Sequence, residues 1–439
     1  MKFLIISKCA DGAGIALRLQ QEGNEVSMFI QDKDCQDCYN GIVPKTSIGK
    51  ALEDDPIVIF DSSGMCDVAD EMKDAGYKVF GAGMGQNGLN DKLEYDRVFA
   101  LKVMKDNGIK IPKTFPFDTI DKGLEFVRQT KKGYVIKPFG DATSDRTFVG
   151  KTADELISEM EGWKKDKVKD KFILQELIKG LEVDTEVYLS HGKIVRATKA
   201  LFETKKFMND DLGPNTGCSS SISFGYKNPD SKMYVKTIKK LEKFFANTDY
   251  TGYFSINCII QDSDQEPYGL EFNPRCGYSD TYATMGILPM EYGKFVSDMV
   301  EGKLKGFEWK SGYGASLRLT VPPYPLLVPD DEKDKTYIER IKKISNNIKI
   351  DGIDLKDKWI IPYDMQKKDG LEMAGIDGIV CEVLSAKGSL MGLKKDLYAR
   401  ADKIKVPNKQ YRTDVVENCM ERLKKFAALG YESPYRGGL

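Results

Sequence analysis

The stretch Gly269-Leu270-Glu271-Phe272-Asn273-Pro274-Arg275 carries metal-binding residue types at the spacing of a β-strand. Glu271 and Asn273 are two residues apart, so on a strand both side chains face the same side of the sheet. Carboxylate and amide oxygens suit Mg²⁺, which shares the rest of its coordination shell with phosphates. Arg275 follows at the strand end, where a guanidinium can bind a phosphoryl group during transfer. Taken alone, an edge strand with a polar face and a surface arginine explains the stretch equally well.

A third ligand for the same cation is predicted on the preceding strand. Residues 252–261 and 268–272 both have strand patterns and are joined by a short polar segment, which predicts a hairpin. Asn257 lies fourteen residues before Glu271 and can reach the same ion across that hairpin. The predicted ligand set is therefore Asn257, Glu271 and Asn273, holding Mg²⁺ or Mn²⁺.

A nucleotide site is predicted upstream of these strands. Lys137 ends an apolar strand and precedes the polar loop 140–146, which places an ammonium and several donors where phosphates can lie. The segment Gln175-Glu176-Leu177-Ile178 leaves a second buried strand, can offer backbone groups to an adenine edge, and has two apolar side chains to line the ring. Glu182 can accept hydrogen bonds from ribose hydroxyls. A snorkelling lysine and an ordinary strand exit are the structural alternatives.

Composition limits the classes of function. The 439 residues correspond to about three domains, and 41% hydrophobic with 30% charged residues indicates a soluble globular chain. A net charge of -1 gives no general attraction to nucleic acid or anionic membranes, so small-molecule substrates are the expected partners. The oligomeric state is not predicted. His191 is the single histidine and lies in a predicted turn, which excludes a multi-histidine metal site and disfavours a histidine-centred triad.

The cysteines indicate a reducing compartment. Nine scattered thiols, an odd number, fit free cysteines in the cytosol better than a disulfide framework. Cys35 and Cys38 have Cys-x-x-Cys spacing, but a zinc ribbon needs a second such pair, so two loop thiols are favoured. No apolar run reaches about 18 residues, and the chain begins directly with a strand pattern. A cytoplasmic protein is expected.

The first 90 residues alternate between strand and helix patterns, which predicts a parallel α/β sheet. Asp11-Gly12-Ala13-Gly14 lies at the first strand–helix turn, where Gly12 and Gly14 can offer backbone N–H groups to a phosphate. A plain tight turn explains the segment as well. Further along the chain, helices are expected at residues 91–108, 230–247 and 413–428.

The order of these motifs resembles the ATP-grasp superfamily. Asp211-Leu212-Gly213-Pro214-Asn215-Thr216-Gly217, followed by Tyr250-Thr251-Gly252-Tyr253, is similar to the phosphoribosylamine–glycine ligase family. Asp96-Arg97-x-Phe99 resembles the first nucleotide-binding helix of carbamoyl phosphate synthetase, where the arginine contacts phosphate. That resemblance assigns Arg97 to nucleotide phosphates.

The resemblance implies an α/β protein with an α+β body: a Rossmann-like domain at 1–110, ATP-grasp subdomains at 111–195 and 196–305, and a C-terminal domain at 306–439. It implies an ATP- and Mg²⁺-dependent ligase that joins glycine to 5-phosphoribosylamine through an acyl phosphate. Lys137 and Arg275 would be catalytic. The residues expected to bind ATP are Arg97, Lys137, Gln175, Glu176, Leu177, Ile178 and Glu182. Those expected to bind substrate are Gly12, Gly14, Asp211, Pro214, Asn215, Thr216, Gly217 and Asp280.

The sequence departs from that family at positions that serve substrates. The family's N-terminal Gly-Gly-Arg-Glu-His loop is replaced by residues 10–15, which contain neither arginine nor histidine, and its Gly-Asp-Pro-Glu segment is replaced by residues 277–280. Three alternatives therefore stay open. They are a ligase of the same mechanism with a different amine or acid, a catalytically silent ATP-binding module, and an enzyme acting on nucleic acid. The neutral net charge disfavours the last.

Overall fold

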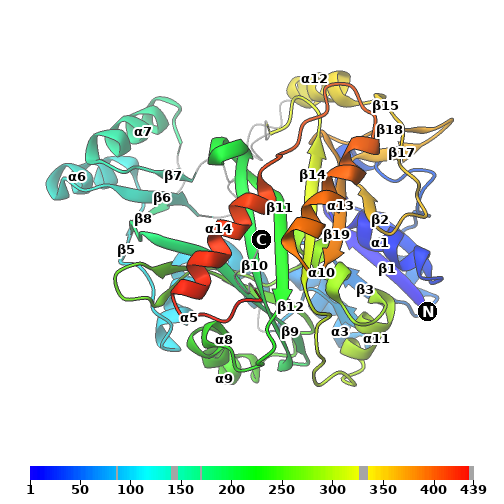
Figure 1. Ribbon diagram of the computed structural model, residues 1–439, viewed down its shortest axis with the longest axis horizontal. Helices are drawn as coiled ribbons and strands as arrows, with labels where there is room; N and C mark the ends of the chain where they lie inside the picture. Colours follow the sequence, from blue (N-terminus) through cyan, green and yellow to red (C-terminus); the bar gives the residue numbers. More distant parts are fainter. Residues whose placement is uncertain (86–87, 140–146, 169–170, 326–334, 435–439) are drawn as a thin grey trace.

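The computed structural model describes residues 1–85, 88–139, 147–168, 171–325 and 335–434. In these ranges the strands form four sheets of four, eight, three and four strands. In Figure 1 the eight-stranded sheet runs through the centre, with the N-terminal sheet (blue) on one side and a small lobe (cyan) on the other. The polar loop 140–146, expected beside a nucleotide, lies outside the described residues.

The N-terminal sheet is parallel, as the alternation of patterns predicts. Leu4, Ile5, Val58 and Ile59 are fully buried at the centre of the sheet. In spatial order its strands are β2 (Glu25–Ile30), β1 (Lys2–Ser7), β3 (Ile57–Phe60) and β4 (Val79–Phe80). The helices of this region are α1 (Ala13–Gln21), the 3-10 helix η1 (Lys33–Cys35), α2 (Ile48–Leu52) and α3 (Cys66–Asp74).

The small lobe is a four-stranded sheet covered by two helices (Figure 1). Leu124, Met160 and Phe172 are fully buried between the helices and the sheet. In spatial order the strands are β5 (Thr114–Phe117), β8 (Phe172–Glu176), β6 (Tyr134–Pro138) and β7 (Phe148–Val149), and the helices are α6 (Ile120–Thr130) and α7 (Ala153–Lys165). Thr152 caps α7 by accepting a hydrogen bond from the N–H of Glu155.

The eight-stranded sheet contains the predicted hairpin. In spatial order it comprises β13 (Pro267–Asn273), β12 (Gly252–Gln261), β9 (Gly180–Ser190), β10 (Lys193–Met208), β11 (Leu212–Gly225), β14 (Tyr313–Thr320), β19 (Ile379–Lys387) and β16 (Ile360–Pro362). Asn257 lies opposite Glu271, and Ser255 lies opposite Asn273, so the predicted pairing is confirmed. The sheet continues past residue 306 through the pairing of β11 with β14. The division into domains stays a prediction.

The remaining elements surround this sheet. The helices are α10 (Tyr278–Ile287), α11 (Tyr292–Val300), α12 (Lys335–Ser345), α13 (Leu390–Lys403) and α14 (Val415–Ala428), and a three-stranded sheet is formed by β15 (Lys349–Ile350), β18 (Leu371–Met373) and β17 (Met365–Lys367). The helix expected at residues 413–428 is therefore confirmed as α14. Within the described ranges, no helix combines the length and apolar character that a membrane span requires.

Two helix predictions were wrong because each segment contains a break. Residues 91–108 form α4 (Leu89–Tyr95) and α5 (Arg97–Asp106), separated at Asp96. Asp96 has non-helical φ and ψ of -96° and 89°, and its carboxylate caps the N–H of Phe99. Residues 230–247 divide into α8 (Lys232–Lys236), η4 (Ile238–Leu241) and α9 (Glu242–Phe245), because Thr237 has φ -124° and ψ -99°. The break at Asp96 makes Arg97 the first residue of a helix.

Candidate active site

A cavity of about 350 Å³ opens between the eight-stranded sheet, the start of α5 and the small lobe. Its lining contains residues from β6, β9 to β13, α10 and β14. Ten of the residues predicted from the sequence meet there: Arg97, Lys137, Asn215, Thr216, Gly217, Asn257, Glu271, Asn273, Arg275 and Asp280. These residues are spread over nearly 200 positions of the chain, and the fold brings them to one cavity.

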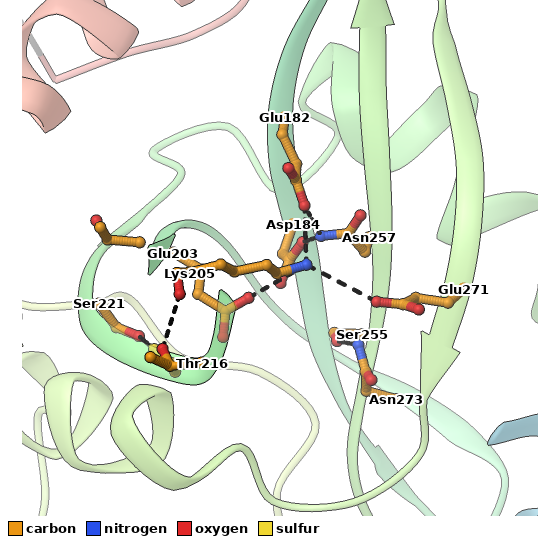
Figure 2. Close-up of polar contacts among 12 residues, drawn as sticks. Glu182, Asp184, Glu203, Lys205, Thr216, Ser221, Ser255, Asn257, Glu271 and Asn273 are labelled. Carbon is orange, nitrogen blue, oxygen red and sulfur yellow. Dashed lines mark hydrogen bonds and ion pairs between the residues drawn. The ribbon is translucent and has the colours of Figure 1, made fainter. Parts of the chain in front are cut away.

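The three predicted metal ligands lie side by side on β12 and β13 (Figure 2). The Asn257 Nδ2 donates hydrogen bonds to Asp184 Oδ1 at 2.5 Å and to Glu182 Oε1 at 3.0 Å. Its Oδ1 is buried and has no hydrogen-bond partner among the described residues. A buried amide oxygen normally has a partner. A cation coordinated by this oxygen would supply the partner, and amide and carboxylate oxygens are the ligands that a hard divalent ion prefers.

Lys205 on β10 is a site residue that the sequence analysis missed. Its Nζ lies 2.9 Å from Glu182 Oε1, 3.6 Å from Glu203 Oε2 and 3.9 Å from Glu271 Oε1. Figure 2 shows the ammonium reaching across the sheet into this group of carboxylates. Burial lowers the pKa of Lys205, but the carboxylates outweigh burial and hold that pKa well above its usual value. The Glu203-x-Lys205 spacing on a strand is the signal that could have revealed it.

Three cations surround Glu271. Besides Lys205, the Arg97 Nη1 lies 3.0 Å from Glu271 Oε2, and the Arg97 Nε donates to the carbonyl of Pro138 at 2.9 Å. Lys137 is 9% exposed, and burial lowers its pKa to about 8 although Glu271 opposes the shift. Burial raises the pKa of Glu271, but Lys205, Lys137 and Arg97 together bring it well below its usual range. Lys205, Lys137 and Arg97 therefore form a compact group of cations that can bind phosphate oxygens.

Arg275 is held by a second missed residue, Glu94 on α4. The Arg275 Nη2 and Nε lie 3.0 Å and 3.1 Å from Glu94 Oε1, and its Nη1 donates to the carbonyl of Cys276 at 3.2 Å. Glu94 also accepts a hydrogen bond from the hydroxyl of Ser63. The guanidinium is thereby fixed at the end of β13, on the rim of the same cavity.

A second charged corner lies deeper in the cavity. Asp280 on α10 is 4% exposed and pairs through Oδ1 with Lys199 Nζ at 2.9 Å, and Lys199 also pairs with Glu186. Asp280 Oδ2 is buried without a hydrogen-bond partner in the described part of the chain. Arg318 on β14 adds a cation beside this corner, with its Nε 2.7 Å from Glu382 Oε1. The corner therefore offers opposite charges to a small zwitterion.

The glycine-rich turn at the start of α1 is closely packed. The N–H of Gly12 donates to Asp61 Oδ2 at 2.6 Å, and the hydroxyl of Ser7 donates to the same oxygen. A Cβ at Gly12 would overlap Asp61, and one at Gly14 would overlap Ile361. A phosphate at Gly12 would have to replace the carboxylate of Asp61. The roles predicted for Gly12 and Gly14 in substrate binding stay predictions.

Several predicted residues do not line the cavity. Asp211 pairs with Arg412 at 2.8 Å and accepts a hydrogen bond from Asn418, and Pro214 is likewise outside the lining. The four residues from Gln175 to Ile178 are also outside it, and the Gln175 side chain donates to Thr114 Oγ1 at 3.2 Å.

Glu182 and Thr216 reach the site through Lys205. Glu182 accepts a hydrogen bond from the ammonium of Lys205, and the hydroxyl of Thr216 donates a hydrogen bond to the backbone carbonyl of Lys205 at 2.8 Å. His191 lies elsewhere, at the β9–β10 turn, with its Nε2 3.0 Å from the carbonyl of Val300.

Comparisons with known proteins place the chain near one family of ligases. Residues 95–281 match the family model of the phosphoribosylglycinamide synthetase ATP-grasp (A) domain. A phosphoribosylamine–glycine ligase from Clostridium acetobutylicum is 23% identical over 371 residues, which cover 79% of this chain and 80% of that protein. The segment that the family model matches contains Lys137, Lys205 and Glu271.

Solved structures show the same fold. The crystal structure of a phosphoribosylamine–glycine ligase from Thermotoga maritima aligns with a TM-score of 0.69 at 21% identity, covering 94% of this chain and all of that one. The biotin carboxylase domain of a Hydrogenobacter thermophilus 2-oxoglutarate carboxylase, solved with MgADP, aligns with a TM-score of 0.64 at 10% identity over 98% of this chain and 99% of that one. The ATP-grasp resemblance and the α/β class predicted from the sequence are confirmed.

Proposed function

We propose that this chain, which carries an ATP-grasp domain of the phosphoribosylglycinamide synthetase type over residues 95–281, is an ATP-dependent carboxylate–amine ligase. Its reaction joins glycine to 5-phosphoribosylamine and yields glycinamide ribonucleotide, ADP and phosphate. One observation carries the proposal: Asn257, Glu271 and Asn273, which are ligand types for a hard cation, line a single cavity together with the cations Arg97, Lys137 and Arg275.

The proposed reaction has two steps. A carboxylate oxygen of glycine attacks the γ-phosphorus of ATP, the bond from that phosphorus to the bridging oxygen of ADP breaks, and glycyl phosphate forms. The amine of phosphoribosylamine then attacks the acyl carbon, phosphate leaves with the acyl oxygen, and the nitrogen loses a proton. Such transfers depend mainly on positioning and on neutralising charge. They need no histidine, which fits a chain with one.

Arg97, Lys137 and Arg275 have separate tasks in this scheme. Arg97 and Lys137 bind the nucleotide phosphates from the α5 and β6 sides of the cavity. Arg275, fixed by Glu94, stabilises the phosphoryl group during transfer and the acyl phosphate afterwards. Because Lys137 is buried beside two other cations, its charge is not screened by bulk water.

The residues of β12 and β13 would hold the metal that ATP requires. Asn257, Glu271 and Asn273 would hold Mg²⁺, which would supply positive charge to offset the charge of the phosphates. Lys205 offsets part of the negative charge of Glu182, Glu203 and Glu271. Its ammonium helps to hold the pKa values of Glu182 and Glu271 below their usual range against burial, whereas burial raises the pKa of Glu203.

The corner at Asp280 suits glycine. The partnerless Oδ2 of Asp280 can accept a hydrogen bond from the glycine ammonium, while Lys199 balances the other oxygen. Arg318 lies in the same lining and can attract the glycine carboxylate. Of the two carboxylates predicted for this task, Asp280 is favoured, because Asp211 is paired with Arg412 outside the cavity.

A ligase of the same mechanism with a different amine is the second candidate. It is favoured by the N-terminal turn, where residues 10–15 contain no cationic side chain and Asp61 occupies the N–H of Gly12. A phosphorylated amine needs cations or aligned N–H donors, because its charge is costly to desolvate unpaired.

The test supplies ATP, Mg²⁺, glycine and freshly generated phosphoribosylamine, and detects glycinamide ribonucleotide by mass spectrometry. Omitting each component in turn is the control. ADP formation only from another acid–amine pair would favour the second candidate. Nucleotide binding without ADP formation from any pair in an acid and amine panel would favour a silent ATP-binding module.

A further inference from the structure

We propose a metal site for a thiolate-binding divalent cation, of the Zn²⁺ class, on Cys9, Asp32 and Cys35 at the edge of the N-terminal sheet. One ligand atom from each residue, two Sγ atoms and a carboxylate oxygen, lies within 4.8 Å of the other two. Ligand atoms around a tetrahedral Zn²⁺ are about 3.5–3.8 Å apart, given Zn–S near 2.3 Å and Zn–O near 2.1 Å. Small side-chain rotations therefore close the site on one ion.

The backbone brings these residues together without help from a metal. β1 and β2 are parallel, with Ser7 opposite Ile30, so the loops that follow them leave the same edge of the sheet. The N–H of Asp32 donates to the carbonyl of Lys8 at 2.9 Å, which ties the two loops together. Asp32 Oδ1 accepts from the N–H of Asp34 at 2.9 Å and is oriented by that bond. The ligand positions are thus largely preorganised, which favours binding.

The donor set selects the kind of metal. Two thiolates and one carboxylate suit Zn²⁺, whereas Mg²⁺ requires oxygen ligands, so this site and the one near Glu271 differ in preference. Binding as thiolates releases one proton from each of Cys9 and Cys35. Cys38, the other thiol of the Cys-x-x-Cys pair, lies instead 4.0 Å from Asp364 Oδ1 and is fully buried. Water would complete the coordination shell.

The site accounts for a motif that the proposed ligase does not use. The sequence alone disfavours zinc, because a ribbon needs two Cys-x-x-Cys pairs. The fold brings Cys9 from the loop after β1 to Asp32 and Cys35 in the loop after β2, so one thiol of the pair suffices. A bound ion would crosslink the loop that contains Asp11 and Gly12 to the loop after β2. It would stiffen the start of α1 without contacting the ATP cavity.

The test uses the full-length protein, purified with a reductant and stripped of metal by a chelator. Titration with ZnCl₂ against a chromophoric chelator should give one ion per chain. CoCl₂ should give the visible absorption and the sulfur-to-cobalt charge transfer of tetrahedral thiolate coordination. Cys35→Ser should weaken Zn²⁺ binding by more than about 100-fold, exceeding the effect of removing an outer-shell group. Cys38→Ser, the matched control, should bind as the wild type does.

Asp32→Asn keeps both thiols and tests the third ligand. It should weaken Zn²⁺ binding yet retain the sulfur-to-cobalt band, and circular dichroism should show that each variant is folded. Equal binding by wild type and Cys35→Ser would overturn the proposal. So would a wild-type protein that binds no Zn²⁺, whether its thiols are free or a Cys9–Cys35 disulfide is found by thiol counting. ATP turnover is measured separately, so failure here leaves the ligase assignment untouched.

Discussion

Asn257 and Glu271 are directly opposite each other on β12 and β13, and the amide oxygen of Asn257 has no protein partner among the described residues. The pairing register thus places an acceptor without a partner beside a carboxylate, on a face that also carries Lys205. The proposed reaction would use this pairing of β12 and β13 to bring two of the three predicted metal ligands together.

Glu271→Gln keeps the side-chain shape and removes the charge that a hard cation requires. We expect kcat to fall by at least about 100-fold, since metal charge stabilisation contributes several kcal/mol. Because Glu271 also pairs with Arg97 and Lys205, the variant should lose some stability as well, and its thermal midpoint is measured to show that it is folded at the assay temperature. Initial rates across a Mg²⁺ series and differential scanning fluorimetry provide the measurements. Glu421→Gln, on the exposed face of α14, is the control. Wild-type activity with unchanged Mg²⁺ dependence would show that Glu271 is not a ligand.

ATP affinity should weaken as pH rises through about 8, the pKa of Lys137. Below that pH the side chain is an ammonium that attracts phosphate, and above it the charge is lost. Calorimetric Kd values for ATP should therefore rise from pH 7 to pH 9. Lys137→Arg, whose guanidinium stays charged, should flatten the profile. Lys137→Ala should weaken binding by roughly 1.5 kcal/mol or more at pH 7. A pH profile identical in wild type and Lys137→Arg would exclude this residue as the titrating group.

Glu94→Gln should lower kcat while leaving the KM for ATP nearly unchanged. The reason is that Glu94 pairs with Arg275 and is not one of the residues proposed to bind the nucleotide phosphates. A double-mutant cycle with Arg275→Lys measures the coupling, which we expect at about 0.5–3 kcal/mol. Additive effects of the two substitutions on kcat would mean that the ion pair has no part in orienting Arg275.

Asp280→Asn should raise the KM for glycine by about tenfold or more, the scale of one charge-assisted hydrogen bond. The KM for ATP should stay constant and serves as the internal control, since the nucleotide cations lie on the other side of the cavity. Steady-state kinetics with glycine varied at saturating ATP give the answer. If instead only the thermal midpoint fell, Asp280 would be a structural partner of Lys199 and not a substrate ligand.

The local sequence pattern was sufficient to predict the hairpin that carries the predicted metal ligands. It was not sufficient to predict the helix break at Asp96. The alternation of Glu271 and Asn273 is a two-residue signal that any strand expresses, so the ladder with Asn257 followed from sequence. A break in α4–α5 depends on whether the Asp96 carboxylate caps Phe99, and the same residue is tolerated inside a helix.

The missed residues depend on contacts between distant segments. Glu94 becomes a site residue only through Arg275, 181 positions away, and Lys205 only through carboxylates on β9 and β13. Asp211 failed to reach the cavity for the same kind of reason, since Arg412 binds it from the C-terminal part of the chain. Pair partners of this kind are set by tertiary structure, which a single sequence does not specify.

Arg97 joins two bodies that otherwise belong to different sheets. Its Nε donates a hydrogen bond to the carbonyl of Pro138 in the small lobe, and its Nη1 donates one to the carboxylate of Glu271 in the eight-stranded sheet. The guanidinium therefore links the lobe that carries Lys137 to the sheet that carries the predicted metal ligands. A nucleotide phosphate that bound Arg97 would compete with Pro138 and Glu271 for its N–H groups. The tilt of the lobe and the occupancy of the nucleotide site are consequently linked through one side chain.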